Sequence, residues 1–296
     1  MNQKISIIGT GLLGMSLALA VTQNFSDNNN SLFLWDPHLD SVSIKQLIMR
    51  VRQLSKNKKM KMKWITKFPD EITNSKYVLL CSPAATIVPL LKKIQPQFNQ
   101  NMIVMDVASV KNHIVQQSEK NTLFINHFVP CHPMTGKEKS GFQWADSNLY
   151  KNKTIFITPL KGTPNSLIQQ TANFWKKLKA NPLIIDPLQH DAKVAWTSHL
   201  PHVLACLLVQ LVKENVGSPQ EIRKFIGSGF LDFTRIASGN PQIWKDIISM
   251  NYKNIQLTIR KYRVELMKLE NKLNYPTSDS WEKFFQVSKK QREKLL

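Results

Sequence analysis

Residues 5–14 read ISIIGTGLLG, and this stretch decides the fold of the first half of the chain. A short apolar run typical of a buried strand leads into Gly9, Gly11 and Gly14, which have the spacing GxGxxG, and a helix-compatible run follows over residues 12–21. The first glycine permits a tight turn, the second lets the backbone approach a pyrophosphate, and the third lets the helix pack closely on the strand. The stretch predicts a unit that binds a dinucleotide, although a glycine turn in an unrelated α/β protein would share its spacing.

The residues around this loop indicate which dinucleotide it takes. Leu12 and Leu13 open the helix, whose N-terminal N–H groups face an anion. Asp36 ends a second apolar strand, 22 residues after the last glycine, where a carboxylate binds the ribose hydroxyls. The same carboxylate would repel the 2′-phosphate of NADP, and no arginine follows it, so we predict NAD as the cofactor. Ser82 and Pro83, after another apolar strand, are expected beside the cofactor or in a plain strand-to-loop turn.

Further strand patterns alternate with helical or polar stretches, as in a parallel sheet covered by helices on both faces. The predicted strands are residues 32–36, 77–82, 103–107, 154–158 and 183–185. The predicted helices of the second half are residues 189–216, a stretch after Ser218, residues 241–273, and a short helix from residue 276 on. The expected fold class is α/β, with a Rossmann-type dinucleotide-binding domain over residues 1–187 and an all-helical domain over residues 188–296.

Composition limits the other classes of function. The net charge of +20 comes from basic residues spread along the chain, with a denser stretch over residues 56–63, and no nucleic-acid-binding motif accompanies them. We expect no nucleic-acid partner, only a positive field that attracts anionic ligands. No apolar run approaches the ~20 residues that span a bilayer, and no signal-peptide pattern opens the chain, so we expect a cytoplasmic protein without a membrane partner. Cys81, Cys131 and Cys206 are odd in number and widely spaced, which favours a reducing compartment and no metal site.

Two compact motifs carry three histidines. Residues 132–136 read HPMTG, and residues 198–202 read SHLPH. An enzyme that passes hydride to a nicotinamide also needs a group for the accompanying proton, and histidine, with an ordinary pKa of ~6.5, suits that task near neutral pH. The glycine loop and these histidines together predict a dehydrogenase. Pro201 should leave the carbonyl of Thr197 unbonded and kink the helix at this motif.

These motifs together resemble one family, the prephenate and arogenate dehydrogenases of tyrosine biosynthesis. The resemblance spans nearly the whole chain and rests on GTGLLG at 9–14, DVASVK at 106–111, HPMTGKEKSG at 132–141, HD at 190–191, SHLPH at 198–202 and DFTRIASGNPQIW at 232–244. It implies the oxidative decarboxylation of prephenate to 4-hydroxyphenylpyruvate. A hydride leaves the ring carbon that carries the 4-hydroxyl, that hydroxyl loses its proton, and the ring carboxylate departs as carbon dioxide.

The resemblance implies roles for the groups that this reaction needs. His132 matches the catalytic histidine, which accepts the hydrogen bond from the 4-hydroxyl. Ser109 matches a serine that hydrogen-bonds near the same hydroxyl and the nicotinamide; its alternative role is to cap the following helix. Arg235 matches the cation that binds a substrate carboxylate, because a guanidinium can bind a carboxylate through two hydrogen bonds. Asp232, on the same helical face, is expected to hold that arginine in place or to form a simple surface pair.

Four further residues match positions that line the family's pocket, and a fifth departs from the family pattern. His199 and His202 share a helical face, and we expect His202 to contact substrate. His199 would pack beside it, donate to a carboxylate, or be a hydrogen-bonded core histidine. Glu138 is expected to order polar side chains at the pocket mouth or to be a surface carboxylate, and Trp244 to wall the pocket or pack in the core. Lys137 replaces the family's small hydroxyl residue, and either adds a cation or points to solvent.

Several alternatives stay open at this point. The motifs fit arogenate as well as prephenate, and a cation-rich pocket favours prephenate because arogenate carries an extra ammonium group. A β-hydroxyacid dehydrogenase would share the domain pairing and use Lys193, which leaves the SHLPH motif unexplained. A protein that binds NAD without catalysis is the third class. The apolar helical domain also predicts a homodimer.

Overall fold

The structure is a computed structural model that describes residues 3–25, 30–55, 60–274 and 278–295. Its contacts form two compact units, Met1–Tyr252 and Lys253–Leu296. The helices that directly follow Asp186 belong to the first unit, because they pack on the α/β part of the chain. The domain boundary that we place at residue 187 is a change in sequence pattern and stays a prediction.

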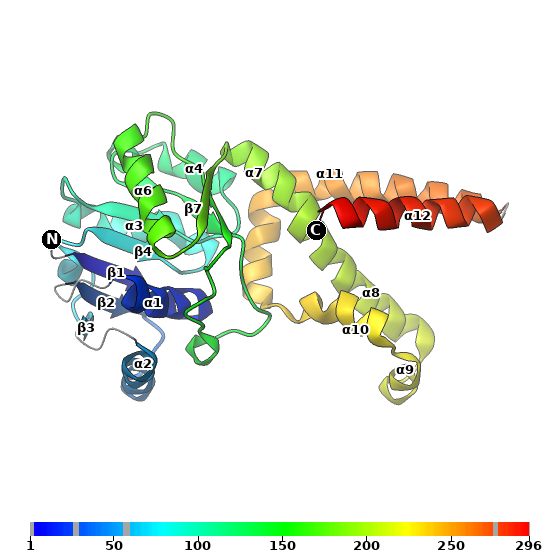
Figure 1. Cartoon of the computed structure of the whole chain (residues 1–296), viewed down its shortest axis with the longest axis horizontal. Helices are drawn as coiled ribbons and strands as arrows, with labels where there is room; N and C mark the ends of the chain where they lie inside the picture. The colour runs from blue at the N-terminus through cyan, green and yellow to red at the C-terminus, as the bar shows by residue number, and fades with distance from the viewer. Residues whose placement is uncertain (1–2, 26–29, 56–59, 275–277, 296) are drawn as a thin grey trace. The chain divides into compact units, whose positions relative to one another are not determined.

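A six-stranded parallel sheet forms the centre of the first unit (Figure 1). Its strands are β1 (Lys4–Ile8), β2 (Ser31–Trp35), β3 (Lys61–Trp64), β4 (Tyr77–Leu80), β5 (Ile103–Asp106) and β6 (Phe128–Val129). They lie in the order β3-β2-β1-β4-β5-β6, and all neighbouring pairs are parallel. The order reverses between β1 and β4, where open α/β sheets bind ligands at the carboxyl ends of the strands. The predicted Rossmann-type fold is confirmed.

Two strands of this sheet were not predicted from the sequence. The edge strand β3 holds the second half of the basic stretch at residues 56–63, of which residues 56–59 lie outside the described part. Its lysines alternate with Met62 and Trp64, and lysine is a residue that protects an exposed sheet edge. The other missed strand, β6, is only two residues long. Neither pattern resembles the apolar runs of the central strands.

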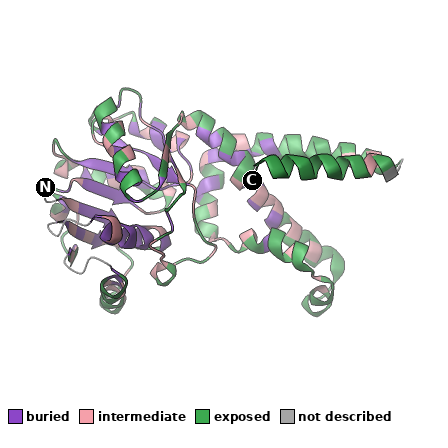
Figure 2. Cartoon of the chain, in the orientation of Figure 1, coloured by how far each residue is buried: buried purple, intermediate pink, exposed green. Residues whose placement is uncertain are grey.

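Both faces of the sheet are buried, whereas the later helices are largely exposed (Figure 2). Because successive side chains along a strand point to opposite faces, Ile5 and Ile7 join one core cluster and Ile8 joins the other. The first face packs against α1 (Leu12–Asn24), α2 (Ser41–Leu54) and α6 (Asn165–Lys177). The second face packs against α3 (Ile87–Ile94), α4 (Asn112–Ser118) and α5 (Thr122–Ile125).

The strands predicted at residues 154–158 and 183–185 do not extend the parallel sheet. They are β8 (Thr154–Ile157) and β9 (Asn181–Ile184) of a separate sheet with the order β7-β8-β9, in which β7 (Cys131–Pro133) runs antiparallel to β8. The chain leaves the first sheet at Pro130, which has no N–H to donate to a strand ladder. An apolar run predicts a buried strand but not the sheet that it joins. The second sheet is important because β7 carries His132.

The part after Asp186 is helical, as predicted. Its helices are α7 (Pro187–Val194), α8 (Leu200–Val216), α9 (Pro219–Phe225), α10 (Ser228–Thr234), α11 (Pro241–Leu273) and α12 (Ser278–Leu295). A π-helical turn, Ala195–His199, joins α7 to α8, which has Pro201 in its first turn. Since a proline cannot complete the regular helical hydrogen bond, the kink expected at the SHLPH motif takes the form of this wider turn.

The continuous helical run Pro187–Val216 is, by length and composition, apolar enough to cross a membrane. By this measure our expectation that no run approaches spanning length is wrong. The run nevertheless contains four buried polar residues, His190, Asp191, His199 and His202. Core helices of globular domains pass the same test of composition, and buried polar groups that bond to neighbouring elements are typical of them.

Close backbone approach explains two glycines of the first loop. Gly9 has a φ of +94°, and a Cβ there would lie 2.5 Å from the carbonyl oxygen of Cys81. A Cβ at Gly14 would lie 1.9 Å from the carbonyl oxygen of Gly9. A Cβ at Gly11, in contrast, would meet no atom of the described residues within 4 Å. The loop therefore needs two of its glycines for folding, and the third keeps a space open.

Replacing Gly14 with alanine should lower the free energy of unfolding by roughly 1–3 kcal/mol or more, because the added methyl overlaps the backbone of Gly9. The matched variant Gly11→Ala should cost less than about 1 kcal/mol, the usual loss at a helix N-cap. Urea denaturation followed by circular dichroism measures both values. Equal stability of the two variants would contradict the packing described for this loop.

Candidate active site

The glycine loop fits a dinucleotide at the switch point of the sheet. Gly11 is the N-cap of α1 and has no side chain with which to cap the helix, and the first turn contains no acidic residue. The space that a side chain at Gly11 would occupy is free of described atoms. An open space before an uncapped helix N-terminus suits a pyrophosphate, because the N–H groups at Leu12 and Leu13 and the helix dipole favour negative charge.

Asp36 lies beside this loop at the carboxyl end of β2. The N–H of Gly9 donates to the carbonyl of Trp35 at 2.8 Å, which brings the two strand ends together. Asp36 Oδ2 accepts hydrogen bonds from the N–H and hydroxyl of Thr10 at 2.8 and 3.1 Å, and Oδ1 accepts the N–H of His38 at 3.0 Å. These bonds fix the carboxylate while its remaining lone pairs can accept from ribose hydroxyls.

Ser82 and Pro83 follow β4 at the same edge of the sheet. The chain turns there into a short 3-10 helix, in which the hydroxyl of Thr86 donates to Ser82 Oγ at 2.8 Å. The N–H of Ala85 donates at 3.1 Å to the buried carboxylate of Asp246 on α11. The segment is therefore a strand-to-loop turn that also attaches α11 to the carboxyl edge of the sheet, and its contact with a cofactor stays a prediction.

A chain of hydrogen bonds reaches His132 from the interior. Its Nδ1 lies 2.9 Å from Nε2 of His190 on α7, and Nδ1 of His190 lies 2.8 Å from Asp191 Oδ1. The carboxylate of Asp191 also accepts the N–H of Lys111 at 2.9 Å on Oδ1 and that of Asn112 at 3.0 Å on Oδ2. His190 and Asp191 are fully buried, whereas His132 is 8% exposed. The structure thus joins the catalytic candidate to a buried carboxylate through a second imidazole.

The carboxylate of Asp191 determines the direction of the hydrogen bonds that link it to His190 and His132. Because both oxygens of Asp191 accept from backbone N–H groups, the proton between Asp191 and His190 belongs to Nδ1 of the imidazole. If His190 carries only that proton, its Nε2 has a lone pair and accepts from Nδ1 of His132. In that arrangement Nε2 of His132 has a lone pair, and no group in the described part of the chain hydrogen-bonds it. It is therefore the atom that can accept a proton.

Burial keeps two histidines of the site neutral. Desolvation lowers the pKa of His132 well below its ordinary value of 6.5, and the neighbouring His190, Lys111 and His199 lower it further. Desolvation also lowers the pKa of His199 to about 4, despite the opposing effect of the nearby Asp191. Near neutral pH both rings are uncharged, so His132 is present as a base.

A break in α11 brings an amide to the same group. Asn251 leaves helical geometry, with φ −119° and ψ 21°. Its Nδ2 donates to the backbone carbonyl of Asp191 at 2.9 Å and lies 3.1 Å from Nδ1 of His199. The carbonyl of Asp191 can only accept, so the atom of Asn251 that contacts it is the amide nitrogen. The second proton of that nitrogen is donated to Nδ1 of His199. A neutral His199 then carries its proton on Nε2, the opposite tautomer from His132.

His202 and Trp244 form a stacked pair next to His199. Their ring centroids are 3.4 Å apart at an interplanar angle of 9°, and the ring of His199 meets the same indole edge-on at 6.1 Å. Gly239 makes room for the stack, because a Cβ there would lie 2.7 Å from Trp244 Nε1. Trp244 packs against both histidines. Its role as a wall of the pocket and the contact of His202 with substrate stay predictions.

Ser109 lies half-buried in the loop between β5 and α4. The N-cap of α4 is Lys111, so the alternative in which Ser109 caps this helix is wrong. The loop begins at Asp106, whose carboxylate accepts the N–H of Cys131 at 2.9 Å, directly before His132. The segments that carry the serine and the histidine are thus bonded to each other.

Arg235 pairs with Glu138 rather than with Asp232. The ion pair with Glu138 joins the start of a 3-10 turn to the loop after β7, and its side chains are 61% and 32% exposed. Asp232 is exposed on α10, which ends at Thr234, so Asp232 and Arg235 do not share one regular helical face. That change of helix type explains why the expected role of Asp232 is wrong, whereas Glu138 does order a polar side chain.

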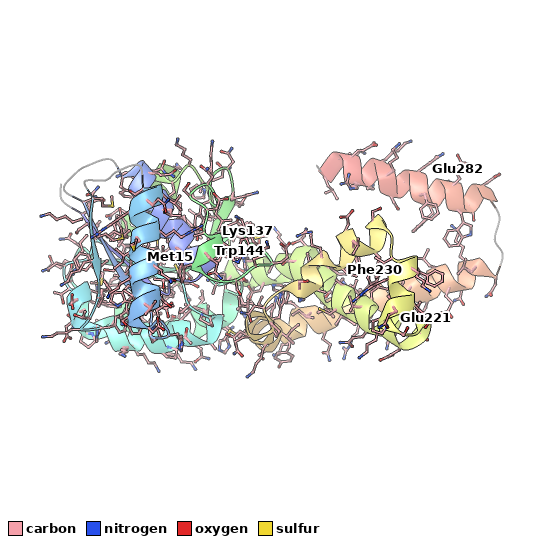
Figure 3. The ribbon with its side chains drawn as sticks, turned by 90° about the horizontal axis from the view of Figure 1, so that it is seen from below. Met15, Lys137, Trp144, Glu221, Phe230 and Glu282 are labelled. Carbon is pink, nitrogen blue, oxygen red and sulfur yellow. The ribbon has the colours of Figure 1, made fainter. Side chains whose placement is uncertain are left out.

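Lys137 is held by an acidic neighbour. Its Nζ lies 3.3 Å from Asp146 Oδ2 and 3.5 Å from the carbonyl of Trp144, and Figure 3 shows Lys137 and Trp144 side by side. Both members of the ion pair are partly exposed, at 39% and 41%. Lys137 is therefore neither a free pocket cation nor a side chain that only points to solvent.

Sequence reasoning missed the residues that direct His132. His190 and Asp191 stood in one of the resembling segments without a role, because distance along the chain does not reveal which buried ring a histidine will meet. A carboxylate next to a histidine in an otherwise apolar run was the available clue, since buried charged groups need partners. Nothing in the sequence around Asn251 indicated a break in the helix.

Two family descriptions match the chain. Residues 44–183 match the nucleotide-binding domain of prephenate dehydrogenase, and residues 186–290 match its dimerisation domain. The border between the two matches falls where the sequence pattern turns helical.

Individual proteins show the same likeness. A cyclohexadienyl dehydrogenase of Zymomonas mobilis is 28% identical over 97% of this chain and 94% of its own length. The crystal structure of prephenate dehydrogenase from A. aeolicus, in complex with hydroxyphenyl propionate and NAD+, matches 100% of this chain and 99% of that one with a TM-score of 0.86 at 26% identity. Arogenate dehydrogenase of Synechocystis matches 99% of this chain and 100% of its own with a TM-score of 0.79 at 25% identity. This chain belongs to the prephenate dehydrogenase family and is an oxidoreductase.

Proposed function

We propose that this protein binds NAD and catalyses the oxidative decarboxylation of prephenate to 4-hydroxyphenylpyruvate. The observation that carries the proposal is the buried ring of His132, whose Nδ1 lies 2.9 Å from Nε2 of His190 and whose pKa burial lowers well below 6.5. NAD, when bound, supplies the hydride acceptor. The open space at Gly11 would receive its pyrophosphate, and Asp36 would accept from its ribose.

His132 provides the base that the substrate hydroxyl needs. As hydride leaves the ring carbon, Nε2 of His132 takes the hydroxyl proton and the oxygen becomes a carbonyl. The bond from the ring to its carboxylate then breaks, carbon dioxide departs, and the electron pair of that bond makes the ring aromatic. The oxygen, now a phenolate, takes the proton back from His132. While the proton is on His132, the buried Asp191 stabilises the charge through His190.

Arg235 and His202 would bind the substrate around this base. The guanidinium of Arg235 suits a substrate carboxylate, which would replace or join Glu138 as its partner. His202, with its plane fixed by Trp244, would contact the substrate beside His199. These contacts accord with an anionic substrate, since the chain carries a net charge of +20.

The net charge of +20 favours prephenate over arogenate, which has an additional ammonium group. Family membership does not separate the two, because relatives bear both names. The acidic residue expected at the pocket mouth, Glu138, already pairs with Arg235, so it offers the ammonium less attraction. Lys137 adds little repulsion, because Asp146 opposes its charge.

The proposal includes a cytoplasmic homodimer formed through the helical part. The match to the dimerisation domain covers residues 186–290. Large apolar side chains are exposed in the same region, among them Leu207, Leu211, Phe225, Leu231 and Phe285. Exposed large apolar side chains are common in regions that bind a partner.

The variant His132→Asn should lower kcat by roughly 10²-fold or more, because it removes the proton acceptor. The affinity for NAD should change by less than about twofold, since the glycine loop is untouched. NADH absorbance measures turnover, and a fluorescence titration measures cofactor binding. His113→Asn, the same change at a histidine outside the hydrogen-bonded chain, is the control. Parallel losses of turnover and NAD affinity would show that His132 has only a structural role.

Prephenate should give the higher kcat/KM when it is compared with arogenate under identical conditions, because the net positive charge of the protein disfavours an added ammonium. Steady-state kinetics with both substrates and NAD make the comparison. A tenfold preference for arogenate would reverse the assignment of substrate. A purified protein that binds NAD but oxidises neither compound would instead support the non-catalytic alternative.

A further inference from the structure

Within the described residues, strand β7, which carries His132, has a neighbouring strand on one edge only. It pairs with β8, and the flanking bonds from Thr158 N–H to the carbonyl of Pro130 and from Met134 N–H to the carbonyl of Thr154 belong to that edge. Because N–H and C=O groups alternate in direction along a strand, the peptide groups of Cys131 point to the other edge. Any group that bonds to the N–H and carbonyl of Cys131 at that edge holds the backbone directly next to His132, the proposed base.

Two buried side chains bind both of these peptide groups. The N–H of Cys131 donates to Asp106 Oδ1 at 2.9 Å, and its carbonyl accepts from Lys111 Nζ at 2.8 Å. Asp106 Oδ2 and Lys111 Nζ also form an ion pair, with both side chains completely buried. The pair supplies one acceptor and one donor, as a neighbouring strand would.

The same pair binds the loop that carries Ser109. Asp106 Oδ2 accepts the N–H of Ala108 at 3.1 Å, directly before the serine. The backbone N–H of Lys111, at the other end of the loop, donates to Asp191 at 2.9 Å. The carboxylate of Asp106 therefore bonds both to Ala108, the neighbour of Ser109, and to Cys131, the neighbour of His132.

We propose that Asp106 and Lys111 are positioning residues, whose buried ion pair fixes His132 relative to Ser109 so that both reach one substrate hydroxyl. The inference rests on the proposed function. Neither side chain touches the reacting atoms, so the pair acts through the backbone of the two segments. The expected effect is large, because displacing a reacting group by about 1 Å can cost ~10²-fold in rate.

The test removes both charges together, in the double variant Asp106→Asn/Lys111→Met, because removing one alone would leave a buried charge without a partner. We expect kcat to fall by about 30- to 100-fold, with circular dichroism unchanged and NAD affinity within about twofold. The matched control is Lys63→Met/Glu71→Gln, which removes a 2.6 Å ion pair near the edge strand. A control that loses as much activity as the test variant would contradict the proposal.

A second readout does not depend on turnover. Lys111 is one of the groups that lower the pKa of His132, so its removal should raise that pKa. NMR titration of the His132 ring in the folded double variant should show a midpoint above that of the wild type, and the acid limb of kcat should move to higher pH with it. An unchanged midpoint together with unchanged kcat would overturn the proposal. Absence of turnover in the wild type would instead refute the proposed function and leave the NMR test valid.

Asp106→Glu gives an independent test that retains both charges. The added methylene should displace β7 or the Ser109 loop while the ion pair persists, so kcat should fall at least tenfold with little change in NAD affinity. This variant decides the matter if the double variant does not fold. Full activity in folded Asp106→Glu would show that the position of these segments does not depend on the pair.

Discussion

The carboxylate of Asp191 sets the direction of the hydrogen bonds on which the proposed site depends. Backbone N–H groups of Lys111 and Asn112 hold it in place, so it can only accept from His190. With its proton on Nδ1, His190 accepts from His132 through Nε2, and Nε2 of His132 is then the nitrogen that takes a proton. The chemistry assigned to this chain therefore begins with the contact between helix α7 and the loop before α4, where these groups meet.

Keeping these histidines neutral has a cost in stability at acid pH. The folded protein lowers the pKa of His132 and His199 below 6.5, chiefly by burial. Below that pH the unfolded chain binds protons that the folded protein excludes, so stability should fall as the pH drops from about 6.5 toward 4. Near neutral pH neither state protonates these rings extensively and the cost disappears. The site thus combines a base that is available at neutral pH with a fold that weakens in acid.

Local patterns predicted the parts of the fold that depend on local physics. The glycine spacing and the apolar strands gave the Rossmann-type domain because a tight turn and a doubly buried sheet restrict residue choice strongly. The edge strand β3 was missed because its lysines interrupt the apolar pattern. The strands β8 and β9 were predicted, but their separate sheet was not, because strand patterns do not specify partners. His132 was found from its motif, whereas its link to Asp191 and the pairing of Arg235 with Glu138 depend on contacts between distant segments. Such contacts become visible only in three dimensions.

The tautomer of His132 tests the central claim most directly. In protein labelled with ¹⁵N in histidine, NMR resolves protonated from unprotonated ring nitrogens, and the spectrum of His132→Asn identifies the signals of His132. We predict a neutral ring at pH 7 with its proton on Nδ1 and a lone pair on Nε2, as the hydrogen bond to His190 requires. A proton on Nε2, or a charged ring at pH 7, would contradict the proposed role of His132 as the base.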